Sequence, residues 1–421
     1  MWIAGAGPLA FALRYDYRFP VLPPLPMASS DILVIGAGVV GCSVAFHLAA
    51  FGAGRVTVLE RRQVGAGTTA QSSGILRTHY SVPENVELAR RSWRVFERFP
   101  EALGDDEASA GLVRCGYLIV APAEGPKRDA LAASLAQQAA MGIEVHTLSA
   151  AEAAQRLPIA CFDEGELIGY EPEAGFADAY LVATSYARAA RRRGVHLREG
   201  VEVRGLRREG GRVVGVDTSE GPIDAGVVVS TQNIWAREIE AWTGIASPVV
   251  AERHRVLALD APQAYTPQMP VFKDLASPGM LYARSYGGRQ MLVSEGLAGQ
   301  VLEGTDDRQG EVDMDFVADI GEQTAQRFPA WAEAGLASSW TGVYDVTPDW
   351  NPVLGPLPEV PGLVVGYGFS GHGFKLSPAV GRVLAQAALG LPTDVSLAPY
   401  ALERFRAGRL VTGRYGAGAV S

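Results

Sequence analysis

The sequence predicts an α/β protein with two sheets, one mainly parallel and one antiparallel. Three observations carry this prediction. Residues 31–60 run through an apolar segment, a glycine-rich turn, a helical pattern and a second apolar segment, which is the order of a βαβ unit. Between residues 247 and 297, short strand-like segments alternate with turns and no strong helix, as in an antiparallel sheet. The tail from residue 363 returns to a strand, a glycine-rich turn and a helix, so the first domain is predicted to be discontinuous.

The βαβ unit carries a dinucleotide-binding fingerprint. Its first strand leads into Gly36, Gly38 and Gly41, and its second strand ends on Glu60. The first glycine permits a tight turn, the second lets backbone approach a pyrophosphate, and the third lets the helix lie close to the sheet. The helix N-terminus offers N–H groups to phosphates, and the acid accepts hydrogen bonds from a ribose. The unit therefore predicts a Rossmann-like domain, and the alternative is a glycine-rich turn in an ordinary α/β domain.

The remaining elements follow from periodicity and end signals. Ser149 precedes Glu152 at the spacing of a capping box. Three arginines end another helical pattern just before Gly194, which is typical of a helix C-terminus. We expect helices over residues 83–99, 127–141, 149–157, 179–193, 312–328 and 377–389, and strands over residues 116–120, 144–148, 195–202, 213–218, 226–230, 255–259, 280–283, 290–294 and 363–365.

This order of elements divides the chain into two domains. Residues 29–90, 150–240 and 340–421 are predicted to form the Rossmann-like domain. Residues 91–149 and 241–339 are predicted to form a second α+β domain on the antiparallel sheet. Residues 1–28 pass from an apolar stretch into PVLPPLPM, and no positive segment precedes that stretch. We therefore expect an N-terminal extension outside the fold and not a signal peptide.

Composition excludes several classes of protein. The chain has 421 residues, 48% of them hydrophobic, and a net charge of −9, which disfavours nucleic-acid binding. Its three cysteines form no CxxC pair, so we expect no disulfide framework, no metal site and a cytoplasmic location. No uninterrupted apolar run reaches the length of about 18 residues that a membrane span needs. The basic residues include only three lysines, Lys127, Lys273 and Lys375, which makes each of them noteworthy.

Four motifs together resemble the D-amino-acid-oxidase-like FAD superfamily, and within it the branch of sarcosine oxidases (monomeric enzymes and β subunits) and glycine oxidases. The first motif is the fingerprint that ends on Glu60, and the second is GTTAQSSGILRTHY at residues 67–80. The third is YEPEAGFADA at residues 170–179. The fourth is the pair WTGVYDVTPDWNPVLGP at residues 340–356 and GFSGHGFKLSP at residues 368–378. The resemblance extends over the chain from residue 29 onward and implies FAD as the cofactor.

The fourth motif predicts how the chain tunes a flavin. Its glycine loop leads into a helix expected to start near Ser377 and Pro378. A helix N-terminus stabilises negative charge, so it would raise the electron affinity of a flavin beside it. By resemblance, the GTTAQSSG loop follows the pyrophosphate and flavin, and Arg61 and Val203 lie beside the adenosine. The alternatives are a plain αβ loop for the fourth motif, a surface turn for GTTAQSSG and a solvated arginine for Arg61. The predicted cofactor residues are Gly36, Gly38, Gly41, Glu60, Arg61, Thr68, Thr69, Ser72, Ser73, Gly74, Val203, Gly342, Gly368, Gly371, His372, Gly373, Phe374 and Lys375.

The resemblance also implies a clamp for a substrate carboxylate. Arg77 matches the arginine that binds this group in monomeric sarcosine oxidases, and Lys375 matches their second contact. A guanidinium fork and an ammonium point charge suit one carboxylate. The alternatives are a structural ion pair for Arg77 and an exposed loop lysine for Lys375, while His372 either faces the flavin or packs. Further candidates for the pocket wall, each equally suited to core or rim, are Tyr344, Tyr282, Tyr80 and His254.

Two positions depart from the monomeric sarcosine oxidases. Their flavin-tethering cysteine aligns with Gly342, so we expect FAD to be bound non-covalently. Their oxygen-activating lysine aligns with Leu292, which leaves open a dehydrogenase with another acceptor or an oxidase with another cation. Because some members of this branch are subunits of heteromeric enzymes, a homo- or hetero-oligomer is also expected as one possibility.

Together these features predict FAD-dependent oxidation of the CH–NH bond of a small amino acid or of a secondary or N-methyl amine, such as sarcosine or glycine. The product is an imine, and the electrons pass to O2 or another acceptor. The chemistry needs no metal. Two alternatives stay open: an FAD-binding scaffold, assembly factor or subunit of a heteromeric dehydrogenase without amine turnover of its own, and an FAD-dependent oxidoreductase of a 2-hydroxy acid or a glycerophosphate.

Overall fold

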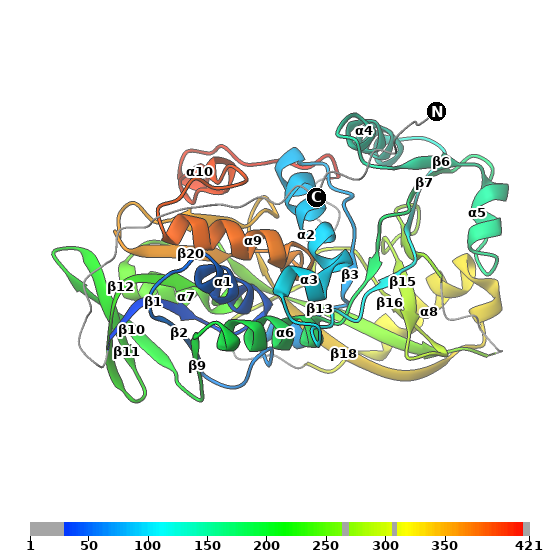
Figure 1. Cartoon of the computed structure of the whole chain (residues 1–421). Coiled ribbons are helices and arrows are strands. Elements are labelled where there is room, and N and C mark those ends of the chain that lie inside the picture. Colours follow the sequence, from blue (N-terminus) through cyan, green and yellow to red (C-terminus); the bar gives the residue numbers. More distant parts are fainter. Residues whose placement is uncertain (1–28, 263–268, 305–309, 416–421) are drawn as a thin grey trace, which may run out of the picture.

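The computed structural model describes residues 29–262, 269–304 and 310–415. The predicted extension over residues 1–28 lies outside the described residues. Two large sheets lie at the two ends of the molecule, and the helices of the first domain gather beside one of them (Figure 1). The structure confirms the predicted fold class, an α/β protein with a mixed, mainly parallel sheet and a largely antiparallel second sheet.

The first sheet is the parallel sheet of the Rossmann-like domain. Strand β1 (Ser29–Ile35) lies at its centre, paired in parallel with β2 (Val56–Glu60) and β12 (Gly221–Ser230). The run Leu33–Ile35 is buried, as expected for a parallel strand covered on both faces. The sheet continues with β9 (His196–Glu199) beside β2, β20 (Leu363–Tyr367) beside β12, β19 (Val353–Pro356) on β20, and the antiparallel pair β10 (Val203–Glu209) and β11 (Arg212–Thr218).

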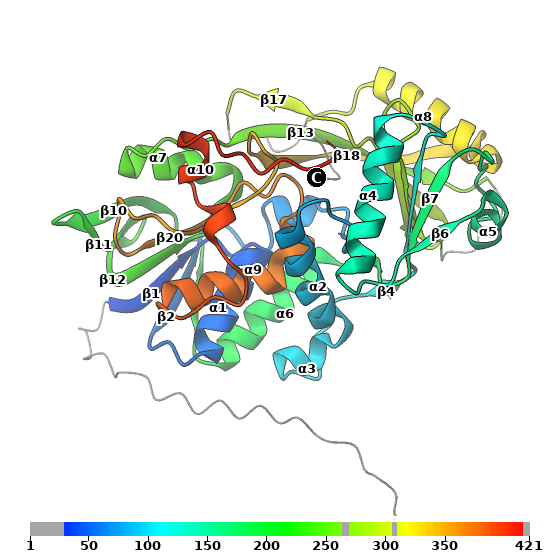
Figure 2. The same ribbon diagram turned by 90° about the horizontal axis from the view of Figure 1, so that it is seen from above.

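Three helices pack together on one face of this sheet. Helix α1 (Val39–Ala50) lies between α6 (Ala179–Arg192) and α9 (Gly373–Ala388) (Figure 2). Residues 39–46 and Leu48 of α1 are buried, because helices and sheet surround the helix. Helix α2 (Pro83–Glu97) packs on α9 and adds to the same core, and the remaining helices of this part are α3 (Phe99–Leu103), α7 (Arg237–Thr243) and α10 (Glu403–Arg406).

The second sheet is antiparallel except for one pair. The long strands β13 (Val250–Asp260) and β18 (Gly335–Val346) pair over most of their length. Helix α8 (Met314–Arg327) covers the apolar face of this sheet, where Phe316 and Ile320 enter its core. The other strands, in spatial order from β13, are β16 (Gln290–Ser294), β15 (Tyr282–Tyr286), β14 (Val271–Asp274), β5 (Tyr117–Ala121), β7 (Leu167–Glu171) and β6 (His146–Leu148), with β17 (Gln300–Leu302) on the far side of β13.

A small third sheet and two helices complete the described structure. Strands β3 (Ile75–Leu76) and β4 (Val113–Arg114) pair on either side of β8 (Gly175–Phe176). Helix α4 is Pro126–Ala140 and α5 is Ala150–Arg156, and the predicted capping box of α5 is present, with both Ser149 and Glu152 engaged.

Sheet pairing and packing depart from the predicted domain boundaries in three places. Strand β7 falls in the segment 150–240 assigned to the Rossmann-like domain, yet it pairs with β5 of the second sheet. Residues 340–346 of β18 fall in the segment 340–421 assigned to the Rossmann-like domain, yet β18 pairs with β13. Conversely, Phe96 and Phe99 pack into the core formed with α1. Hydropathy does not reveal which sheet an apolar strand joins.

Helix α9 begins earlier than predicted. We expected its start near Ser377 and Pro378, but it begins at Gly373 and holds Pro378 in its interior. Proline removes one backbone hydrogen bond from a helix, and here the burial of apolar residues such as Leu376 and Val380 maintains the turn. The helix N-terminus therefore lies within the GHGFK segment itself.

Among the described residues, every helix is too short or too polar to cross a bilayer. In the same part of the chain, no three His, Cys, Asp or Glu side chains come together as a group that could hold a metal ion.

Candidate functional site

Three connected cavities run from the glycine fingerprint to the second sheet. The first, which we call the fingerprint compartment, lies over the carboxyl ends of β1 and β2 and includes Gly36, Glu60 and Trp235. The second, the central compartment, shares Gly38, Thr68, Thr69, Thr231 and Asn233 with the first. The third, the cationic compartment, shares Ser73, Ile75, Tyr344, Gly371 and Lys375 with the second. We call these three compartments, which share wall residues in series, the channel.

The fingerprint turn is built for close approach of backbone. Gly36 adopts φ +94°, a conformation that residues with a Cβ rarely adopt. A Cβ at Gly41 would lie 1.9 Å from the carbonyl oxygen of Gly36, so only glycine lets α1 start this near to β1. Glu60 accepts hydrogen bonds from the N–H groups of Ala37 at 2.9 Å and Arg62 at 2.8 Å, which holds its carboxylate beside the turn.

The far side of the fingerprint compartment is an aromatic and cationic wall. The Arg61 guanidinium lies 4.2 Å from the centre of the Trp235 ring. Val203, buried at the start of β10, also lines this compartment. Both residues predicted to lie near an adenosine are therefore brought to the same compartment as Glu60.

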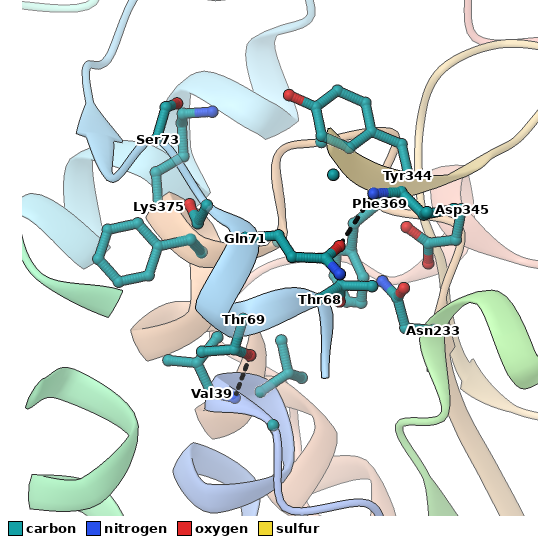
Figure 3. A pocket seen from close by; sticks show the side chains of 18 of the residues that line it. Val39, Thr68, Thr69, Gln71, Ser73, Asn233, Tyr344, Asp345, Phe369 and Lys375 are labelled. Atoms are coloured by element: carbon teal, nitrogen blue, oxygen red, sulfur yellow. Dashed lines mark hydrogen bonds between the residues drawn. The ribbon is translucent and has the colours of Figure 1, made fainter. Parts of the chain in front are cut away.

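The central compartment lies between the N-termini of α1 and α9. The N–H of Val39, in the first turn of α1, donates to Thr69 Oγ1 at 3.1 Å. Gln71 Oε1 accepts from the N–H of Val343 at 2.9 Å, which ties the GTTAQSSG loop to β18. Figure 3 shows both hydrogen bonds, with Lys375 and Ser73 at one end of the view and Asn233 at the other. Gly342, also in the wall, faces the Cβ of Gln71.

The turn before α9 is held in place by a buried acid and an aromatic ring. Asp345 Oδ2 accepts from the N–H of Gly368 at 2.5 Å, and burial raises the pKa of this carboxyl to about 7. Gly371 adopts φ +83°, and a Cβ there would lie 2.4 Å from the Tyr344 ring. Tyr344 in turn stacks on His254, with ring centres 4.0 Å apart. The turn, the tyrosine and the second sheet are therefore packed as one unit.

The cationic compartment contains the two predicted clamp residues. Arg77 is 6% exposed, its Nη1 donates to the carbonyl of His79, and its guanidinium lies 4.6 Å from the centre of the Tyr80 ring. Lys375, in the first turn of α9, is partly buried and lines both the central and the cationic compartments. Desolvation and the positive charge of Arg77 lower the pKa of Lys375 well below its usual value. The predicted alternative of an exposed lysine is excluded.

The structure gathers most predicted site residues, and three of them lie just outside the channel. Gly41, in the first turn of α1, packs against the carbonyl of Gly36, Gly74 approaches the carbonyl of Ala177, and Gly368 positions the turn through Asp345. His372 lines the cationic compartment and packs edge-on against Tyr80. Of the further candidates, Tyr282 lines the cationic compartment, whereas Tyr80 and His254 support wall residues from behind and Leu292 is buried in β16.

Sequence reasoning missed several residues of the channel. The segment that follows β12 contributes Thr231, Asn233 and Trp235. Its position after a buried parallel strand was the available signal, because ligands bind at the carboxyl ends of such strands. Lys273, flagged only for the scarcity of lysine, lines the cationic compartment, as do Tyr117 and Val271.

The channel fits FAD. Two helix N-termini, those of α1 and α9, open onto it, and such termini favour the anionic pyrophosphate and a ring that gains negative charge. Glu60 is the acceptor for a ribose at the fingerprint end. A Cβ at Gly371 would collide with Tyr344, so the wall of the central compartment keeps its shape only with glycine there.

Comparison with known proteins agrees with this geometry. Human mitochondrial sarcosine dehydrogenase is 29% identical over 393 residues, which cover 91% of this chain and 42% of that protein. Sarcosine oxidase subunit beta from an Arthrobacter species is 27% identical over 409 residues, or 94% of this chain and 96% of the other. The crystal structure of L-proline dehydrogenase from P. horikoshii matches with a TM-score of 0.83 at 27% identity, covering 92% of this chain and all of that one. The chain spans less than half the length of the human and mouse sarcosine dehydrogenases.

The profile of one protein family matches most of the chain. It is described as FAD-dependent oxidoreductase and aligns with residues 31–387, which include the fingerprint, the clamp candidates and the start of α9. The chain therefore belongs to the DAO family of FAD-dependent oxidoreductases.

Proposed function

We propose that this protein oxidises the CH–NH bond of a small amino acid or of a secondary or N-methyl amine, and passes the electrons to O2 or another acceptor. One observation carries the proposal: Arg77 and Lys375 line a compartment that shares five wall residues with the one suited to the flavin. The names of the similar proteins, which include sarcosine and proline dehydrogenases and a sarcosine oxidase subunit, support the same class of substrate.

Arg77 and Lys375 would anchor the substrate carboxylate and so fix the orientation of its C–H bond. Bound FAD supplies the two-electron acceptor for that bond. Arg77 is almost fully buried, which strengthens its charge-assisted hydrogen bonds to a carboxylate. Carboxylate binding would also favour the charged form of Lys375, whose pKa is low without an anion beside it.

Gly342 has no group that could form a covalent bond to a flavin, so we include non-covalent FAD in the proposal. Acid precipitation tests this directly, since non-covalent FAD stays in the yellow supernatant. The similarity to a sarcosine oxidase subunit beta over nearly its full length makes a heteromeric assembly part of the proposal as well. The predicted cytoplasmic location stays a prediction.

Anaerobic mixing with a panel of amines and amino acids tests the proposed reaction. We expect at least one amine to bleach the flavin absorbance, and readmission of air then shows whether O2 is the acceptor. Arg77→Ala should raise KM for an amino-acid substrate about 100-fold, because a desolvated charge-assisted hydrogen-bond pair is lost. Arg98→Ala, at an exposed pair with Glu101, is the matched control and should leave KM unchanged. A flavin that stays oxidised throughout the panel would refute the proposal.

A further inference from the structure

Lys273 places a third cation in the cationic compartment, in addition to the two clamp residues. It lies on β14, and its neighbour in register on β15 is Tyr282. Val271, two residues earlier on the strand, lines the same compartment, as expected for side chains that share one face of a strand. Lys273 is only 3% exposed, so its ammonium group is sequestered from bulk water.

The backbone around Lys273 is shaped to accommodate the ammonium group. Its Nζ donates to the carbonyl of Met280 at 2.7 Å, and Met280 adopts φ +48°, which is unusual for a residue with a side chain. A Cβ at Gly296 would lie 1.8 Å from Nζ. An ammonium group has three protons, and the carbonyl of Met280 accepts one of them. Among the described residues, no hydrogen bond uses the other two.

No carboxylate forms an ion pair with this charge in the described part of the chain, and Asp274 offsets it only in part. Asp274, the next residue on the strand, points to the opposite face and pairs with Arg327 at 2.8 Å. Among the described residues, Lys273 forms no ion pair within 4 Å, and no aspartate or glutamate lines the compartment. Glu171, another buried acid, accepts from the N–H and hydroxyl of Thr78 outside the compartment wall.

Burying an uncompensated charge is costly, so a buried lysine of this kind is expected to have a use. Desolvation and the charge of Arg77 lower the pKa of Lys273 to about 7. An anion bound beside it would restore the full positive charge. Lys273 and Arg77 line the cationic compartment only, whereas Lys375 lines the central one too, so Lys273 lies on the side away from the flavin.

We infer that the substrate is an amine with two anionic groups, one held by Arg77 and Lys375 and the second held by Lys273. This inference rests on the proposed function for the identity of the compartment as the substrate site. It deepens that function from a small amino acid to an amino diacid.

Two unreactive probes measure the second anionic subsite apart from turnover. Diglycolate and methoxyacetate are the ether counterparts of iminodiacetate and sarcosine, and neither has a nitrogen from which an imine could form. Titration calorimetry on the FAD-loaded protein should show diglycolate binding at least about 10-fold more tightly than methoxyacetate, since one added charge-assisted contact is worth that much. Equal affinity in the unmodified protein would overturn the inference.

Two lysine variants locate the effect. Lys273→Met keeps a linear side chain without charge and should weaken diglycolate binding about 10-fold more than methoxyacetate binding. Lys127→Met is the matched control, because Lys127 donates to the carbonyl of Leu275 outside the compartment. It should leave the ratio of the affinities for diglycolate and methoxyacetate unchanged. If Lys273→Met fails to retain FAD, Lys273→Gln replaces it. If Lys273→Met leaves the ratio of diglycolate affinity to methoxyacetate affinity unchanged, the preference for diglycolate has another origin and the role of Lys273 is refuted.

Turnover separates this inference from the proposed function. Iminodiacetate should reduce the flavin anaerobically with a kcat/KM at least about 10-fold above that of sarcosine. If diglycolate is preferred but no amine reduces the flavin, the diacid site stands and the proposed reaction fails. If sarcosine is oxidised and neither diacid is preferred, the proposed reaction stands and the inference fails.

Discussion

The same substitution in two helices is expected to have opposite effects on stability. Gly381 lies inside α9 at its crossing with α1, and a Cβ there would be 2.1 Å from Ser43 Oγ and 2.5 Å from Ser43 Cβ. Gly321 lies inside α8, and a Cβ there would meet no heavy atom within 4 Å. Changing each glycine to alanine therefore tests packing and helix propensity separately.

The magnitude follows from two terms. Alanine in place of glycine stabilises a helix interior by about 1 kcal/mol. Overpacking of a close helix contact costs about 1–3 kcal/mol, and the upper end applies at Gly381 because the Cβ of Ser43 cannot rotate away. We therefore expect Gly381→Ala to lower the free energy of unfolding by about 2 kcal/mol and Gly321→Ala to raise it by about 1 kcal/mol.

Urea unfolding of the FAD-free protein, followed by circular dichroism, measures both shifts against the unmodified chain. Gly381→Ala should also weaken FAD binding, because α9 carries Phe374 and Lys375 at its start and would move away from α1. Gly321→Ala, far from the channel, should leave FAD affinity unchanged. The reasoning is refuted if Gly381→Ala is as stable as the unmodified protein or more stable.

Two further predictions concern a buried acid and a helix cap. Burial raises the pKa of Glu171 to about 7 in the folded state. Between the ordinary pKa of a glutamate and about 7, the folded state therefore binds a proton that the unfolded state does not, and the free energy of unfolding falls as pH rises through this range. Glu171→Gln should therefore gain stability relative to the unmodified protein between about pH 5 and pH 8 in urea titrations, and a constant difference would contradict this. Asp178 accepts from the N–H groups of Tyr180 and Leu181 at 2.9 Å, so Asp178→Ala should cost about 1 kcal/mol in the same assay; no change would show that the cap is replaced by water.

Local patterns predicted a large part of the fold because the forces behind them are local. The order strand, glycine turn, helix, strand and acid over residues 31–60 needs no distant partner to be recognised, and β1, α1 and β2 occupy it. The start of α9 was misplaced because Pro378 was interpreted as a first-turn residue, whereas tertiary packing carries the helix through it. Domain boundaries failed at β7 and β18 for a related reason, since an apolar strand does not encode its sheet.

The residues of the candidate site show the same difference between what a local pattern reveals and what only tertiary packing reveals. Motif resemblance identified Arg77, Lys375 and Tyr344, and the structure brings all three to one compartment. Asn233 and Trp235 were missed because they have no motif of their own and reach the channel only through the position of β12 in the sheet.

The sequence by itself determined the Rossmann-like unit and the glycine turns, because each depends on spacing within one short segment, and resemblance to known motifs supplied the pair of candidate clamp residues. Only the tertiary structure decided that Lys273 of the second sheet shares a compartment with residues of the first domain. Charge acts through space and depends on burial, so three cations far apart in sequence come to line one compartment only once the sheets have folded against each other.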